Sequence, residues 1–140
     1  IIKPFFFKFD LPLNTLHVLN TIMASPIYAT FHSSEHLVND IISNAPAVDP
    51  QLMDHIRLRI QNSPTQLAYR TSIPAPQSVD AIRRIIGRNG CYFKMTTQNY
   101  GLFFVWHSRS TNHFHLWGPD IHNLNGAVEV LNQRINNYAS

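Results

Sequence analysis

The sequence predicts an α+β fold in which a three-stranded antiparallel sheet is covered on one face by helices. Residues 65–140 contain segments typical of strand, helix, helix, strand, strand and helix, in that order. Residues 23–64 contain two amphipathic helical segments, which we interpret as an N-terminal helical arm. Apolar residues make up 44% of the 140-residue chain, enough for the core of one domain. No stretch approaches the ~18–20 apolar residues of a membrane span, so we expect no membrane partner.

Residues 1–22 do not read as part of the folded protein. Ile1–Asp10 shows neither a helical nor a strand period, and the first methionine, Met23, precedes an Ala-Ser-Pro sequence typical of a natural start. We therefore expect residues 1–22 to be an over-extended reading frame or a fragment edge. Charged residues and a proline interrupt the apolar core that a signal peptide would need.

The arm begins with Pro26–Phe31, for which a short strand and an extended segment both remain open. Apolar residues recur at helical spacing over 35–44, after a serine that can cap the helix. Asp49 and Pro50 are typical of the start of a second helix, which Asn62-Ser63-Pro64 ends. The two helices either pack against the following domain or form a docking or dimerisation surface.

The predicted sheet domain starts with a strand over 66–73, where apolar and polar residues alternate. Ser78 is placed to cap a helix over 79–86. After a short loop, a second helix runs over 91–99.

Two further strands are predicted over 102–107 and 113–117, joined by the polar turn 108–112. The last helix is predicted over 122–138, because apolar residues recur there at helical spacing.

The loop Gly87-Arg88-Asn89-Gly90 joins the first two helices of this domain and is the candidate functional site. Two glycines permit left-handed backbone and keep the surface free of side chains. The amides that open the next helix have no partner within it and carry the positive end of its dipole, so a phosphate is a natural guest.

The residues around this loop resemble the KH domain, a small module that binds single-stranded nucleic acid. The family pattern is Ile/Val-Ile-Gly, two variable residues, Gly, two more, an apolar residue and Lys, and here it covers Ile85–Lys94. A further glycine, Gly101, stands seven residues after the lysine, and Gly118 corresponds to the glycine after the third strand. The resemblance covers residues 66–138, and the element order is that of the type I arrangement.

The resemblance implies binding of single-stranded RNA or DNA, about four unpaired nucleotides per module, with RNA favoured. The loop would contact phosphates, while the bases would lie in an adjacent apolar groove. The residues expected to contact nucleic acid are Ile86, Gly87, Arg88, Asn89, Gly90, Phe93, Lys94 and Arg109. Ile86 and Phe93 would form the groove floor, and Arg109 would close its far side.

The charge distribution favours a polyanion as the partner of the same region. Residues 1–64 carry a net charge of −1 and residues 65–140 a net charge of +4. The single cysteine, Cys91, excludes an internal disulfide and is typical of a reducing, intracellular compartment.

Catalytic and metal chemistry are not expected. The loop lacks the trailing Lys-Ser/Thr of a nucleotide-binding P-loop, acids are few, and no nucleophile elbow is present. His113 and His115 share a strand face, with His107 and His122 nearby, but no second cysteine or carboxylate stands at ligand spacing. We therefore expect no enzyme activity, metal or cofactor.

Two classes of function remain open. The first is binding of single-stranded nucleic acid through the loop. The second is a KH-like fold used as a structural or protein-interaction subunit, with self-association or a protein partner at residues 23–64. Residue types favoured by AT-rich codons suggest a large DNA virus as the source, which would place such a subunit in the virion or the replication compartment.

Overall fold

The computed structural model describes residues 27–138, so the expectation for residues 1–22 lies outside the described part of the chain. The elements are β1 (Ala29–Phe31), α2 (Ser34–Asn44), α3 (Pro50–Gln61), β2 (Ala68–Pro74), α4 (Val79–Ile86), the 3-10 turn η1 (Arg88–Gly90), α5 (Cys91–Asn99), β3 (Phe104–Ser108), β4 (His113–Gly118) and α6 (Ile121–Tyr138). Among these helices, none is long and apolar enough to cross a membrane.

The strands form one antiparallel sheet in the order β1-β2-β4-β3. The α+β class is confirmed, but the prediction of three strands is wrong. The arm supplies a fourth strand, because Ala29 pairs with Arg70 and Phe31 with Ala68 along the edge of β2. Of the two interpretations of the segment before α2, the strand is therefore the correct one for residues 29–31.

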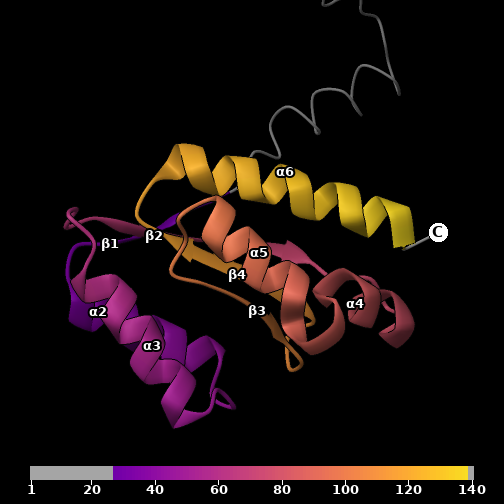
Figure 1. The fold of residues 1–140 in the computed structure, drawn as a ribbon, viewed down its shortest axis with the longest axis horizontal. Coiled ribbons are helices and arrows are strands. Elements are labelled where there is room, and N and C mark those ends of the chain that lie inside the picture. The colour runs from indigo at the N-terminus through magenta and orange to yellow at the C-terminus, as the bar shows by residue number, and fades with distance from the viewer. Residues whose placement is uncertain (1–26, 139–140) are drawn as a thin grey trace, which may run out of the picture.

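Helices cover both faces of the sheet, not one face as predicted (Figure 1). On the first face, α4, α5 and α6 bury a core that includes Ile85, Phe114 and Leu124. On the second face, α2 and α3 pack on one end of the sheet, around Ile56 and Trp117. Side chains alternate along β4, so Phe114 and Trp117 reach opposite cores.

Local capping explains why these helices begin where they do. The Ser33 side chain accepts a hydrogen bond from the amide of His36, and Ser78 accepts one from the amide of Ala81. The Asp49 side chain accepts two hydrogen bonds, from the amides of Gln51 and Leu52 in the first turn of α3. β3 begins later than predicted, because Leu102 still donates to a carbonyl of α5.

Candidate functional site

The loop between α4 and α5 is a tight turn built on left-handed backbone. Gly87 ends α4 with φ 84° and ψ 164°, and Asn89 and Gly90 have φ of 56° and 73°. The Gly90 amide donates to the Gly87 carbonyl at 3.0 Å, which closes the turn. Arg88 and Asn89 at its centre are exposed, as the sequence predicts for residues that meet a ligand.

The two glycines are required for different reasons. A Cβ atom on Gly87 would lie 2.4 Å from a Tyr92 ring carbon and 2.8 Å from the sulfur of Cys91. A Cβ atom on Gly90 would meet nothing within 4 Å. Gly87 is therefore fixed by close packing as well as by its backbone angles, whereas only the backbone angle favours glycine at position 90.

An arginine from α6 joins the two sides of the loop, although no local sequence pattern connects it with this site. Arg134 donates from Nη2 to the Arg84 carbonyl at 2.6 Å and from Nε to the Ile85 carbonyl at 3.2 Å. Its guanidinium carbon lies 3.5 Å from the centre of the Tyr92 ring. We call the cluster of Gly87, Tyr92 and Arg134 the loop clamp.

Exposed positive charge surrounds the loop. Arg83, Arg84, Arg88 and Lys94 are exposed, and Asp80 is the one acid between residues 79 and 99. Within residues 27–138, the salt bridge present joins Arg70 to Asp40 and so involves none of these cations. Their charge is therefore not neutralised by a carboxylate of the described chain.

The other residues of the predicted site are not all brought together. Phe93 is only 8% exposed and packs edge-to-face on Phe114, with ring centres 5.6 Å apart. Its ring is therefore part of the core and offers little surface to an adjacent groove. Ile86 is half-buried against the same core, and Arg109 is exposed on the turn between β3 and β4.

A polar network occupies the second face of the sheet. Asp40 on α2 accepts from Arg70 Nε at 2.7 Å and from Trp117 Nε1 at 2.9 Å. Arg70 also donates to Ser72, whose hydroxyl lies 2.7 Å from His115 Nδ1. Ser72 therefore links Arg70 to His115, and the tautomer of the ring decides which of the two atoms donates in the Ser72–His115 bond.

His115 is kept neutral by its surroundings. Burial first, and then the positive charge of Arg70, lowers its pKa from 6.5 to about 4. It stacks beside His113 with ring centres 6.4 Å apart, whereas His107 packs on Phe114 of the opposite face. Within residues 27–138, no three histidine, cysteine or acidic side chains converge as metal ligands would.

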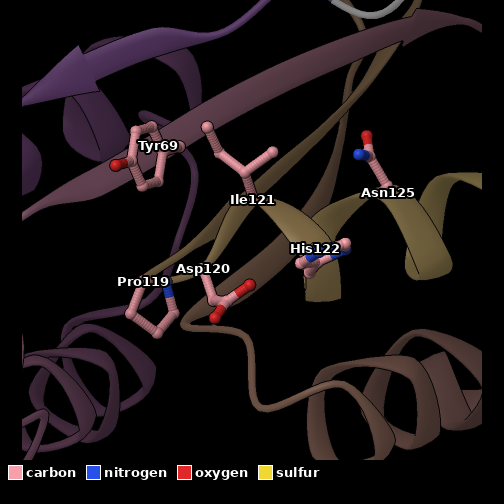
Figure 2. Close-up of a pocket in the computed structure, with 6 residues that line it drawn as sticks. All are labelled: Tyr69, Pro119, Asp120, Ile121, His122 and Asn125. Atoms are coloured by element: carbon pink, nitrogen blue, oxygen red, sulfur yellow. The ribbon is translucent and has the colours of Figure 1, made fainter.

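Two shallow hollows lie elsewhere on the surface. The first, of about 270 Å³, is shown in Figure 2 and is lined by Tyr69, Pro119, Asp120, Ile121, His122 and Asn125. Its acid, Asp120, caps α6 through the amide of Asn123. The second, of about 390 Å³, lies between the end of α3 and the turn after α5 and has a mainly apolar lining. Residues 87–90 contribute to neither lining, so these hollows do not belong to the loop site.

No protein-family model, curated protein or solved structure matches the chain.

Proposed function

We propose that residues 65–140 form a KH-type module that binds single-stranded nucleic acid, with RNA favoured, through the loop Gly87–Gly90. The observation that carries the proposal is the geometry of the loop. Its backbone is left-handed at three positions, and it places Arg88 and Asn89 in solvent immediately before α5.

The start of α5 suits a phosphate oxygen. The Cys91 amide donates to the Arg88 carbonyl, but no side chain caps this helix, so the amides that follow in its first turn have no side-chain acceptor. The amides carry the positive end of the dipole, and Arg88 and Lys94 add charge on either side of the helix start. The polyanion that fits is an unpaired strand, because a single narrow turn contacts one backbone rather than the surface of a duplex.

The order of elements supports the same proposal. From β2 to α6 the chain follows strand, helix, helix, strand, strand, helix, as the resemblance to the KH domain implies. The type I arrangement remains part of the proposal. A base-binding groove beside Ile86 is also part of the proposal, and the buried Phe93 contributes little surface to it. A module with so few contacts should bind on the order of micromolar and lose affinity as salt rises.

Fluorescence anisotropy with short single-stranded RNA and DNA pools tests the proposal. The variant is Arg88→Asp with Asn89→Asp, which keeps both glycines and puts at position 89 a residue that tolerates left-handed backbone. The matched control is Arg57→Asp with Asn62→Asp on and after α3, which changes the net charge equally. We expect salt-dependent binding by the parent and the control and none by the loop variant. Equal binding by all three proteins, or by none, would refute the proposal.

A purely protein-binding role for the arm is less well supported. The apolar stripes of α2 and α3 are already buried on the sheet, around Ile41, Ile56 and Trp117. Two apolar residues of these helices, Ile42 and Leu58, are 43% and 53% exposed. Deleting residues 23–64 would open this core, so the charge-matched point variants are the better way to separate the two functions.

A further inference from the structure

We infer that Arg134 is a positioning residue, which holds the loop in its binding geometry without contacting the nucleic acid. Its effect on binding rests on the function proposed above, whereas its effect on the loop does not. The inference starts from the loop clamp formed by Gly87, Tyr92 and Arg134.

The guanidinium of Arg134 is engaged with the backbone of α4. Its Nε and Nη2 atoms donate to the carbonyls of Ile85 and Arg84, in the last turn of that helix. These carbonyls have no amide partner within α4, and they carry the negative end of its dipole. The guanidinium is planar, positively charged and has several fixed donors, so it can supply hydrogen bonds to both carbonyls and offset the negative end of the dipole. A lysine has no such fixed pair of donors.

The same guanidinium fixes the first turn of α5. Its carbon lies 3.5 Å from the centre of the Tyr92 ring, within the range of a cation–π contact. The ring also lies against Gly87, where a Cβ atom would approach it to 2.4 Å. One side chain of α6 therefore links the end of α4, the first glycine of the loop and the start of α5.

These contacts fix the conformation of the loop in the protein without ligand. If the clamp is opened, the loop samples other conformations, and the apparent affinity falls with the fraction that stays competent. A competent fraction of about one tenth corresponds to a loss of about tenfold. Because Arg134 directs two of its donors at carbonyls, we assign the phosphate contact to Arg88 instead.

The first test needs no ligand and follows hydrogen exchange of the loop amides by NMR. The variants are Arg134→Lys, Arg134→Gln and Tyr92→Leu, with Tyr92→Phe as the conservative rescue, because it keeps the ring. Arg57→Gln on α3 controls for the loss of one positive charge. We expect exchange of the hydrogen-bonded amides of Gly90 and Cys91 to accelerate about tenfold or more in the first three variants. The rescue and the control should match the parent.

The second test measures RNA affinity against salt for the same proteins and for Arg88→Gln. Removing one phosphate contact lowers the slope of log K against log salt by about 0.7 for a single strand. We expect that change for Arg88→Gln, and for Arg134→Gln a loss of about tenfold in affinity at an unchanged slope.

The outcomes separate the two proposals. Loop amides that exchange alike in the parent and in both Arg134 variants overturn the positioning role. A slope that falls in Arg134→Gln as it does in Arg88→Gln overturns it too, because Arg134 would then contact phosphate. If the parent binds neither RNA nor DNA, the proposed function fails, while the exchange result still decides whether Arg134 holds the loop.

Discussion

Replacing each glycine of the loop with alanine should have unequal effects on stability. Gly87→Ala is expected to destabilise the protein by about 3 kcal/mol, and Gly90→Ala by about 1 kcal/mol. Both residues have positive φ, so a common penalty for left-handed backbone does not account for the difference. The difference comes from the region of backbone space and from the contacts of the added methyl group.

The magnitudes follow from the geometry. At φ 84° and ψ 164°, Gly87 lies in a region that only glycine normally occupies, which costs about 1–3 kcal/mol for another residue. The new Cβ atom would also lie 2.4 Å from the Tyr92 ring, so the ring must shift from the position in which it contacts Arg134. The lost cation–π contact adds about 0.5–1 kcal/mol. Gly90, at φ 73° and ψ 21°, is in the ordinary left-handed helical region with open space around it, and alanine there costs about 1–2 kcal/mol.

Equilibrium urea denaturation of the parent and the two variants measures these differences. With a slope of about 2 kcal/mol per M, Gly87→Ala should lower the midpoint by about 1.5 M and Gly90→Ala by about 0.5 M. Asparagine sharpens the comparison, because it tolerates the left-handed helical region: Gly90→Asn should be nearly neutral, and Gly87→Asn as damaging as alanine. A loss for Gly90→Ala that equals or exceeds that of Gly87→Ala would refute the reasoning.

Three further predictions concern the rest of the fold. Asp40→Ala should cost about 2–3 kcal/mol in urea denaturation, because it leaves the Arg70 guanidinium and the Trp117 indole N–H without their acceptor; a cost below about 1 kcal/mol would contradict this. Because burial and the charge of Arg70 lower the pKa of His115 to about 4 in the folded state, the unfolded chain binds this proton first as the pH falls. Protonation of His115 should therefore lower the free energy of unfolding progressively between pH 6.5 and 4, by up to about 3 kcal/mol. The variant His115→Phe should flatten this part of the pH dependence of stability. Asp49→Ala should cost about 1 kcal/mol through loss of the α3 cap, and Asp49→Ser should restore most of it.

The helices next to the loop could be predicted well because their end signals are local. Ser78 begins α4, Gly87 ends it, and α5 starts directly after Gly90, so each boundary is encoded within a few residues. The charge around the loop could also be read directly, because Arg88 and Lys94 are exposed where a polar surface is expected.

The layers of the fold could not be predicted in the same way. β1 has three residues, too few to show an alternating pattern, so its pairing with β2 has no local signal. An amphipathic stripe on α2 and α3 shows that one face is buried but does not say against what. The sequence therefore leaves open whether the two helices form a docking surface or pack on the following domain, as they do on the second face of the sheet.

The loop clamp was missed because it is a contact between distant parts of the chain. Arg134 stands 49 and 50 residues from the carbonyls that it binds, and nothing in the pattern of α6 distinguishes it from a surface arginine. The burial of Phe93 could not be predicted, because its place beside a groove came from the resemblance alone. Its own helix turns it inward, toward Phe114.

The bond from Trp117 to Asp40 spans 77 residues, and it has a consequence for how the chain is made. The apolar side chains of α2 and α3 are synthesised early, but the core that covers them is completed only by residues of β3 and β4. At roughly 5–20 residues per second, the ribosome needs roughly 3–12 s to extend the chain from Ile60 to Trp117. During that interval Leu37, Ile41 and Ile56 lack the part of their core that Phe104 and Trp117 supply, so the second face of the sheet is completed only after most of the chain has been made.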